Sequence, residues 1–595
     1  MDHLSCPICE LRCRFSEGRS GACGLYELQG NQIVERFTDR YLVACPISIE
    51  TVPILHFYPG TKFLQITTTG CNFNCSGCIS TVLVREMSPD SQALQHLSVE
   101  QIIAKVFETQ CQGIVFLMND PISAFPRFLK IAKLAHTKGL KVGCSSNAYF
   151  TLEALTQLIP YLDFINIGMK GFSDKAYHAC GAPQILPVLR NLKILHDAGV
   201  HIEISCILTR DNQSELMDLA LYIAGISRSI PLQVMRFLPF ETAAIIQEPS
   251  IREAENFCQD IRYLLDFVYL FNTPGSEYLH TYCPRCNHVV LYREFYGPMG
   301  AKIHMPQNGL PESFRCPACC HELDVVGSAA QSTYQEGDFE GGYPLTRAME
   351  IVESIFIAMG VTQKALVVRA WEDVLQTGGL HKLHQSIQHP GTYIEAIRYF
   401  GKKAHVSEQA ETLCKYLEER LAVIDTAVAS IIRRPRVYYA MGKPLFYING
   451  GRLENQLVET AGGISVNREL PVGGRPGRTL TVSELNRLNP EIIFISAFIS
   501  NSVEDFCTEC LQYGLRIAAV ENRKIFTFPS SGWDFGSPRW ILGLMYMAFI
   551  LHPDQCAFDI MAEADMFYRN FYGIPFEPMD INLSFSKPSR HWRWH

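Results

Sequence analysis

The sequence predicts an α/β protein of several domains. Between residues 61 and about 242, short apolar strands alternate with amphipathic helices, which is the pattern of parallel strands joined by right-handed crossovers. Groups of cysteines stand before, inside and after this region, and a different pattern begins near residue 343. At 595 residues the chain is also too long for one hydrophobic core.

The first segment, residues 1–60, is a cysteine-rich extension. Four cysteines stand among turn residues such as Gly18 and Gly21, namely Cys6, Cys9, Cys13 and Cys23. Four thiolates can close one metal site, so we expect zinc or an auxiliary iron–sulfur cluster here. The alternative is a set of free thiols without a metal, because cysteine is often simply buried.

Residues 61–270 contain six predicted strands with helices between them. The strands are expected at 63–68, 113–119, 141–147, 164–170, 201–208 and 232–240, and helices at 98–110, 128–138 and 185–198. Six such units predict parallel strands closed or partly closed into a barrel. Chemistry in α/β barrels concentrates where the strands end, so the residues after each strand are the candidate site.

Three cysteines follow the first of these strands directly, in the order CxxxCxxC. They are Cys71, Cys75 and Cys78, and Gly70 ends the strand before them. Three thiolates on one short loop can hold an iron–sulfur cluster and leave one iron open to a small molecule. A zinc site completed by a distant residue is the alternative that spacing alone leaves open.

A second metal signature lies in residues 271–326. It consists of two CxxC turns, Cys283 with Cys286 and Cys316 with Cys319. Each turn directs two sulfurs at one tetrahedral centre, which predicts a zinc ribbon with a structural role. Sulfur ligands do not exclude an auxiliary iron–sulfur cluster. A linker rich in Gly, Ser and Gln follows at residues 327–342.

Composition and charge narrow the class of protein. A net charge of −8 without a basic block argues against a nucleic-acid partner. The N-terminus lacks the features of a secretory signal, so we expect a cytoplasmic protein, and its 22 cysteines then indicate metal binding rather than disulfides. The apolar stretch 541–551 is too short to span a bilayer and predicts a buried helix.

The CxxxCxxC spacing after an apolar strand resembles that of the radical S-adenosylmethionine (radical SAM) enzymes. The four cysteines before the barrel resemble the AmmeMemoRadiSam branch, which is close to the pyruvate formate-lyase activating enzymes. This resemblance implies a partial barrel, a [4Fe-4S] cluster and an open iron that chelates the amino acid end of SAM. It further implies a low-potential electron donor of the flavodoxin or ferredoxin type and an oxygen-free host.

The same resemblance implies which strand ends contact SAM. Met118-Asn119-Asp120-Pro121 is similar to an Asn-Glu-Pro segment of the activating enzymes, and Ser145 to Tyr149 is similar to their Ser-Asn-Gly-Tyr. The implied cofactor-binding residues are Asn119, Asp120, Ser146, Asn147, Lys170 and Arg236. The chain departs from the pattern at Gly168, where relatives have Asp, and at Gly77, where many have an aromatic residue.

Residues 343–580 resemble the cobalamin and iron-chelate binding proteins of ABC importers, in which a long helix joins two lobes. The resemblance is carried by the segments 435–439, 461–463, 483–494 and 537–540, and the apolar spacing of 405–428 suits the connecting helix. The first lobe, 345–393, is about half the usual length. The resemblance implies a cleft for a corrinoid or an iron chelate, and a degenerate docking domain is the alternative.

Together these features predict a radical SAM enzyme. The reduced cluster would cleave SAM to methionine and a 5′-deoxyadenosyl radical, which abstracts hydrogen from a protein or metallocofactor substrate. The alternative is a non-catalytic carrier of a metal complex or corrinoid with a degenerate barrel.

Overall fold

A computed structural model describes residues 4–16, 18, 20–75, 77–239, 245–304, 314–471, 476–497 and 502–578. The chain divides into two compact units. Unit 1 comprises Met1–Pro249, Glu253–Asn272 and Glu277–Thr346, and unit 2 comprises Ser250–Arg252, Thr273–Ser276 and Arg347–His595.

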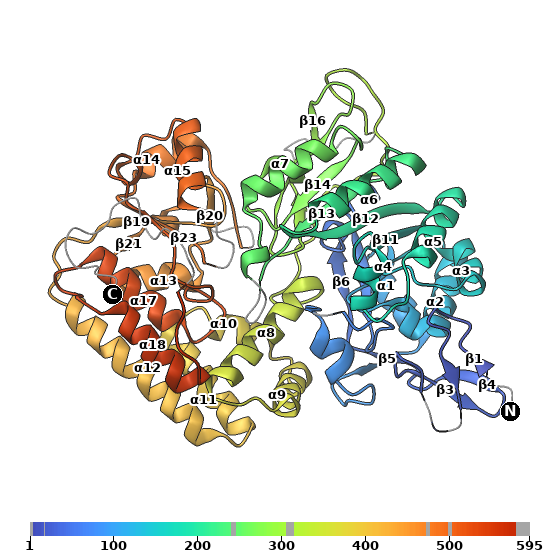
Figure 1. Ribbon diagram of the computed structural model, residues 1–595, viewed down its shortest axis with the longest axis horizontal. Helices are drawn as coiled ribbons and strands as arrows, with labels where there is room; N and C mark the ends of the chain where they lie inside the picture. Colours follow the sequence, from blue (N-terminus) through green and yellow to red (C-terminus); the bar gives the residue numbers. More distant parts are fainter. Residues whose placement is uncertain are drawn as a thin grey trace. The chain divides into compact units, whose positions relative to one another are not determined.

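Unit 1 is built on an eight-stranded sheet among the described residues (Figure 1). The strands lie in the order β14-β13-β12-β11-β10-β9-β7-β6. Their bounds are β6 Val43–Ser48, β7 Lys62–Thr67, β9 Gly113–Phe116, β10 Lys141–Ser146, β11 Phe164–Gly168, β12 His201–Leu208, β13 Leu232–Arg236 and β14 Val268–Phe271. All neighbours pair parallel except β6 and β7, which pair antiparallel.

All six predicted strands are present in this sheet, as β7 and β9 to β13. Two further strands, β6 and β14, lie at its edges and were not predicted. Pro46 within β6 argues against a strand because proline has no N–H, but an edge strand tolerates this loss. The predicted last strand ran to Phe240, and β13 ends at Arg236. Phe240 itself lies outside the described residues.

The helices of unit 1 follow the strands in alternation. Their bounds are α1 Val99–Glu108, α2 Phe125–Thr137, α3 Leu152–Leu158, α4 Asp174–Ala179, α5 Leu186–Asp197, α6 Gln213–Ile226 and α7 Ile251–Ile261. In α1 the Ser98 side chain and Gln101 form a capping box, while Ile102 and Val106 are fully buried. This alternation directs the strand ends that follow β7 and β9 to β13 toward one edge of the sheet.

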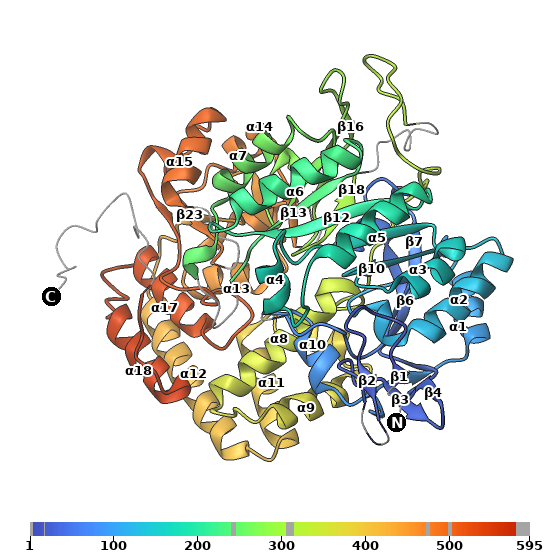
Figure 2. The same cartoon turned by 45° about the vertical axis from the view of Figure 1, so that its right-hand side comes forward.

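Short antiparallel pairs complete unit 1, and Figure 2 shows β1 to β4 grouped near the N-terminus. The pairs are β1 Leu4–Ser5 with β2 Arg14–Phe15, β3 Tyr26–Gln29 with β4 Gln32–Glu35, β5 Arg40–Tyr41 with β8 Gln95–His96, β15 Thr281–Tyr282 with β16 Val289–Leu291, and β17 Arg293–Phe295 with β18 Ala301–Ile303. The first and the fourth of these pairs hold cysteine groups.

Unit 2 contains a six-stranded sheet in its described part, in the order β22-β20-β19-β23-β24 with β21 beside β19. The strands are β19 Arg436–Ala440, β20 Phe446–Ile448, β21 Ile464–Ser465, β22 Gly477–Thr479, β23 Ile492–Ile495 and β24 Ile525–Phe526. Tyr438 and Tyr439 are fully buried in β19.

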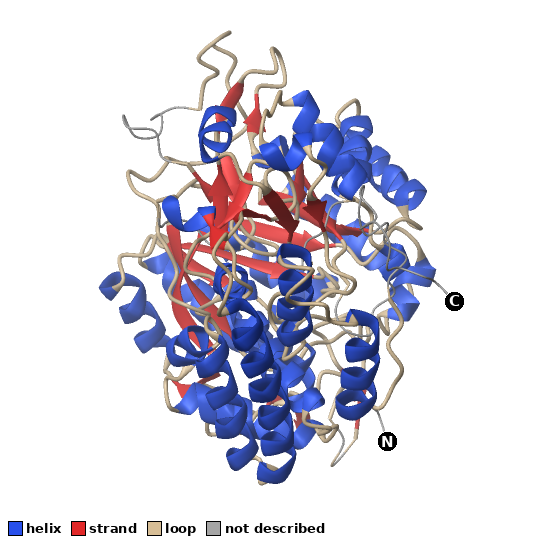
Figure 3. Ribbon diagram, turned by 90° about the vertical axis from the view of Figure 1, so that its left-hand side faces the viewer, coloured by secondary structure: helices blue, strands red, loops and turns tan. Residues whose placement is uncertain are grey.

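Helices surround this sheet; Figure 3 draws them in blue and the strands in red. They are α8 Gly342–Ala358, which begins at the end of unit 1, and α9 Lys364–Gln376, α10 Leu380–Ser386, α11 Pro390–Lys403, α12 Ser407–Val428, α13 Leu453–Thr460, α14 Val482–Leu488, α15 Val503–Gln512, α16 Ala518–Glu521, α17 Trp540–Leu551 and α18 Ile560–Tyr572. The predicted connecting helix is present as α12, and α17 is the predicted buried helix.

The segment 345–393, expected to form a shortened first lobe, is described throughout and contains helices but no strand. Helix α12 packs against α17, and α17 also contacts α18 (Figure 1). In the described part of the chain, no helix combines the length and the apolar character that crossing a bilayer requires.

Candidate active site and cysteine groups

The loop after β7 carries the three cysteines of the CxxxCxxC motif, here called the triad. Gly70 turns the chain into this loop with a φ of +83°. A Cβ atom on Gly70 would lie 2.7 Å from Cδ1 of Leu25 and 3.2 Å from the carbonyl oxygen of Cys23. Glycine is therefore required both by the backbone conformation and by the N-terminal segment packed against the loop.

The triad lines a cavity of about 240 Å³ at the strand ends of unit 1. Five of the six residues expected to bind SAM line the same cavity, namely Asn119, Asp120, Ser146, Asn147 and Lys170. They come from the ends of β9, β10 and β11, so the parallel sheet brings together groups that are far apart in sequence. Gly168 also lines the cavity.

Asn119 holds the loop that leads to the triad. Its Nδ2 lies 2.8 Å from Oγ1 of Thr68 and 3.0 Å from the carbonyl oxygen of Gly70, and its Oδ1 accepts a hydrogen bond from the Thr68 N–H at 3.0 Å. The side chain is almost fully buried. Much of the hydrogen-bonding capacity of this amide is therefore used inside the protein.

Asp120 places a buried carboxylate on the cavity wall. It accepts hydrogen bonds from the Asn147 N–H at 2.7 Å, from the Ser146 hydroxyl at 3.0 Å and from the Ile122 N–H at 3.0 Å. Burial raises the pKa of Asp120, while these hydrogen bonds and the positive charge of Lys170 act in the opposite direction. The site therefore contains one fixed acidic group that can receive an ammonium.

Lys170 supplies the positive charge of the cavity. It reaches into the concave site, so its side chain remains accessible to solvent although many protein atoms surround it. Desolvation lowers the pKa of Lys170, but the thiols of Cys75, Cys71 and Cys78 outweigh this effect and raise it. The ammonium thus lies close to the triad.

Gly168, where the sequence resemblance implies Asp, has space for a Cβ atom. A Cβ atom at this position would meet Nζ of Lys170 at 3.6 Å and Oγ of Ser205 at 3.9 Å, which are ordinary van der Waals contacts. The backbone at Gly168 does not require glycine. The missing carboxylate therefore changes the charge of the cavity rather than relieving a steric clash.

Cys180 is a fourth cysteine beside the triad, and it was not predicted. It caps the end of α4, and its carbonyl oxygen accepts a hydrogen bond from the Asn74 N–H at 2.8 Å. Hydrogen bonding between the two thiols raises the pKa of Cys75 and lowers the pKa of Cys180 to about 7. Burial raises the pKa of the Cys71 thiol to about 12. Iron bound to the triad would therefore displace protons.

Arg236, the sixth residue expected to bind SAM, is not among the residues that line the cavity. Its guanidinium is fully buried, donates to Glu248 at 2.6 Å and donates to the carbonyl oxygens of Asn272 and Pro249. The arginine joins the segments that follow β13 and β14. Its neighbour Met235 lines the cavity instead.

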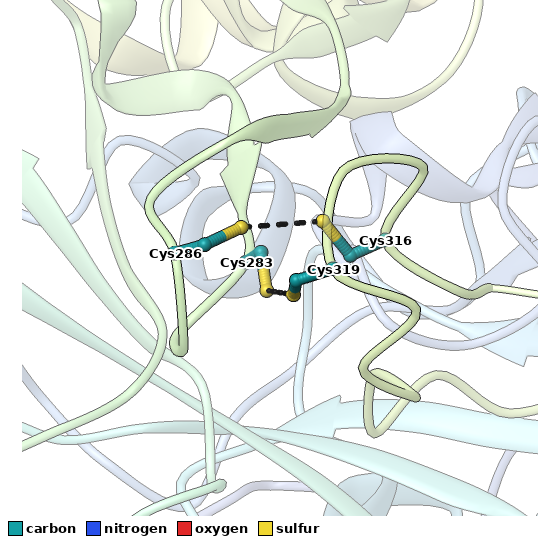
Figure 4. A group of neighbouring side chains, drawn as sticks. All are labelled: Cys283, Cys286, Cys316 and Cys319. Carbon is teal, nitrogen blue, oxygen red and sulfur yellow. Dashed lines mark hydrogen bonds between the residues drawn. The ribbon is translucent and has the colours of Figure 1, made fainter.

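The cysteines of the two CxxC turns form a compact group (Figure 4). Sγ of Cys283 lies 3.6 Å from Sγ of Cys319, and Sγ of Cys286 lies 3.4 Å from Sγ of Cys316. Among the described residues, this is the one group of three or more potential ligand atoms that all lie within 4.8 Å of one another. Tetrahedral zinc with Zn–S bonds near 2.3 Å requires sulfurs about 3.8 Å apart, so the group fits one zinc ion.

The two turns share one backbone design. The Asn287 N–H donates to the carbonyl oxygen of Cys283, and the Cys320 N–H donates to that of Cys316, at 2.8 and 2.9 Å. Asn287 and Cys320 have φ of +58° and +59°. Cys320 therefore serves as the turn residue of the second knuckle, which explains why it stands outside the group of four.

The N-terminal cysteines, here called the quartet, lie around one narrow cavity. Cys6, Cys9, Cys13 and Cys23 all line it. The pairing of β1 with β2 brings the first turn together, and the Cys6 N–H donates to the carbonyl oxygen of Cys13 at 2.8 Å. Burial raises the pKa of Cys6 and raises that of Cys23 to about 11.

Three thiols thus lie on a loop at the edge of a parallel sheet and face a cavity that contains a carboxylate and an ammonium. This arrangement agrees with the family that the chain matches in sequence. Residues 66–223 match the radical SAM superfamily. This radical SAM domain contains the triad and every cavity residue discussed above from strands β9 to β11.

The sequence similarity to two curated proteins covers more residues than the radical SAM domain alone. The chain is 26% identical over 333 residues to the uncharacterized protein MJ0808 of Methanocaldococcus jannaschii, covering 54% of this chain and 96% of that protein. It is 22% identical to the protein YfkA of Bacillus subtilis, covering 34% of this chain and 56% of YfkA.

Among solved structures, a periplasmic solute binding protein from Veillonella parvula matches 32% of this chain and 59% of its own chain, with 21% identity and a TM-score of 0.29. The chain thus spans little more than half of YfkA and of this binding protein.

Proposed function

We propose that the protein is a radical SAM enzyme in which Cys71, Cys75 and Cys78 hold a [4Fe-4S] cluster. The observation that supports this most directly is the triad on the wall of a cavity that also presents Asp120 and Lys170. When bound, the reduced cluster supplies one electron that cleaves SAM to methionine and a 5′-deoxyadenosyl radical.

The chain's own residues bind and orient the ligand. Asp120, held by Ser146 and Asn147, accepts the ammonium of the SAM methionine group, and Lys170 faces its carboxylate. Asn119 fixes the triad loop rather than contacting the ligand, and Arg236 stabilises the sheet edge near Met235. Both are positioning residues in this proposal.

The finer assignment rests on the sequence resemblance. It comprises the AmmeMemoRadiSam or activating-enzyme-like branch, a partial barrel, a cytoplasmic location and a flavodoxin or ferredoxin as electron donor. The substrate is a protein or a metallocofactor, and unit 2 is the proposed site for a corrinoid or iron chelate. Saturable spectral change on titration with cobalamin or a ferric chelate supports that site, and no change with either contradicts it.

The group Cys283, Cys286, Cys316 and Cys319 is proposed as a structural zinc ribbon. The support is the spacing of its sulfurs and the two matching turns. Zinc would join two segments that have little hydrophobic core of their own.

The test of the enzymatic proposal is release of 5′-deoxyadenosine. Protein reconstituted without oxygen, given dithionite and SAM, is expected to release it, and the variant Cys71→Ala/Cys75→Ala/Cys78→Ala is expected to release none. Cys206→Ala, a buried cysteine in β12, is the matched control.

A non-catalytic carrier is the second candidate, favoured by the missing carboxylate at Gly168. Protein with a full complement of iron in the triad that releases no 5′-deoxyadenosine would support the carrier and contradict the enzyme. Release by Gly168→Asp alone, with no release by the natural sequence, would show that this one group separates the two functions.

A further inference from the structure

The sulfurs of the N-terminal quartet are not as closely spaced as those of the group Cys283, Cys286, Cys316 and Cys319. Cys6 and Cys9 are buried, Cys13 and Cys23 are half-buried, and all four line the same narrow cavity. Yet they do not form a group with ligand atoms all within 4.8 Å, although every one of these residues is described. Four sulfurs on one zinc ion would lie about 3.8 Å apart.

The chain provides its own reference for both kinds of spacing. The four sulfurs at Cys283 to Cys319 lie close together, as a single ion requires. The triad, which matches a family that binds an iron–sulfur cluster, is spread wider than 4.8 Å, as is the quartet. In such a cluster the cysteines are distributed over two or more irons. Their sulfurs must therefore lie farther apart than four sulfurs bound to one ion.

Asn72 provides an independent observation. Its side chain lines the quartet cavity and is 5% exposed, and its Nδ2 has no hydrogen-bond partner among the described residues. Its Oδ1 accepts a hydrogen bond from Nδ2 of Asn147 at 2.8 Å, which fixes the amide. An unpaired buried N–H group costs free energy unless an acceptor is bound beside it.

Sulfur atoms of an iron–sulfur cluster are such acceptors, and N–H groups directed at them raise the reduction potential. The cavity is otherwise lined by apolar residues such as Ile8, Phe15 and Ile122, which provide the low-polarity shell typical of these clusters. The residue before Asn72 is Cys71, which lines the other cavity. One peptide unit therefore connects the two sites.

We propose that Cys6, Cys9, Cys13 and Cys23 hold an auxiliary iron–sulfur cluster, with the Asn72 amide donating a hydrogen bond to it. The site is separate from the triad, so it does not depend on cleavage of SAM by this protein.

The test uses the full chain carrying Cys71→Ala/Cys75→Ala/Cys78→Ala, reconstituted without oxygen with iron and sulfide. We expect this variant to retain iron and acid-labile sulfide in equal amounts, together with one zinc per chain. A further Cys13→Ser substitution, at the half-buried edge of the cavity, is expected to remove most of the iron and leave the zinc.

Two controls locate the iron. Adding Cys206→Ala is expected to leave the iron in place, and adding Cys286→Ser is expected to remove zinc rather than iron. A triad variant with two zinc ions per chain and no iron would overturn the proposal. So would a variant that holds no metal beyond one zinc, or one whose iron is lost with Cys286→Ser.

The Asn72 contact has its own readout in the same background. Asn72→Ala removes the donor, so the reduction potential of the remaining cluster is expected to fall while its iron content stays constant. An unchanged potential would contradict the proposed hydrogen bond. This measurement does not depend on whether the further Cys13→Ser variant folds.

Discussion

At the scale of single residues, Asp120 is the acidic group that the structure presents to a ligand in the triad cavity. Because charge-assisted hydrogen bonds contribute roughly 1.5–3 kcal/mol, Asp120→Asn is expected to raise the KM for SAM about 10- to 100-fold. Iron content should be unchanged, since Asp120 is not a cluster ligand. Steady-state assays of 5′-deoxyadenosine with iron analysis check this.

The matched control for this prediction is Asp260→Asn, an exposed position on α7. It should leave both quantities unchanged. An unchanged KM for SAM in Asp120→Asn would show that this carboxylate does not bind SAM. Loss of iron would instead show that Asp120 has a structural role.

In unit 2, the buried Asp534 predicts a pH effect on stability. Its Oδ2 accepts hydrogen bonds from Tyr439, Ser496 and the Ala497 N–H, but burial, reinforced by the charge of Glu454, raises its pKa to about 6. An unfolded Asp titrates near 3.9, so the folded state binds this proton more tightly. The contribution of this proton to the free energy of unfolding is fully present below about pH 4 and is lost as the pH rises through about 6.

Asp534→Asn is therefore expected to stabilise unit 2 at pH 7.5, by on the order of 2 kcal/mol, and to do little at pH 4. Amide exchange of β19 and β23 in the full chain measures this locally. Equal effects of the substitution at both pH values would contradict the assigned cause.

At the scale of elements, one amide joins the end of β9 to the loop after β7. Asn119→Ala would leave the Thr68 N–H and the Gly70 carbonyl oxygen without their buried partner, at a cost of about 1–3 kcal/mol. We expect the triad cluster to assemble but to lose iron to a ferrous chelator faster.

Ser123→Ala is the control, because it removes only one contact of the same amide. A chelation rate for Asn119→Ala equal to that of the natural sequence would show that the loop holds its conformation without this residue.

The strand pattern also shows what sequence reasoning can and cannot reach. Six buried parallel strands give continuous apolar runs, so their positions and the residues after them were predictable. Edge strand β6 contains Pro46, and β14 has four residues, so neither carries a strong signal. Cys180 was missed because a lone cysteine has no informative spacing, and only the packing of α4 brings it to Cys75.

The roles of predicted residues depend on contacts that a sequence does not contain. Arg236 was predicted to bind SAM from the family resemblance; in the structure it forms an ion pair with Glu248 and is not among the residues that line the cavity. Asn119 was predicted to contact SAM; it lines the cavity, and its hydrogen bonds to the triad loop support the positioning role that we propose for it.

At the scale of the whole molecule, one of the three cysteine groups differs from the other two in sulfur spacing. The sulfurs of Cys283, Cys286, Cys316 and Cys319 all lie within 4.8 Å of one another, whereas those of the triad and of the quartet do not. CxxC turns are short-range patterns, so the zinc-like group was predictable from sequence. The sequence could not distinguish zinc from an iron–sulfur cluster at the quartet, because that choice depends on the distances between separate segments of the chain. The first lobe of unit 2, residues 345–393, was expected from resemblance, and the helices that the structure shows there were not predicted from the sequence.

The central claim is that the triad leaves one iron open for SAM, and electron–nuclear double resonance of the reduced cluster tests it most directly. With SAM carrying ¹⁵N and ¹⁷O in its methionine amino and carboxylate groups, we predict hyperfine coupling of both nuclei to the cluster. The coupling should disappear in the triad variant. A fully reduced triad cluster that shows no coupling to either label would contradict the account.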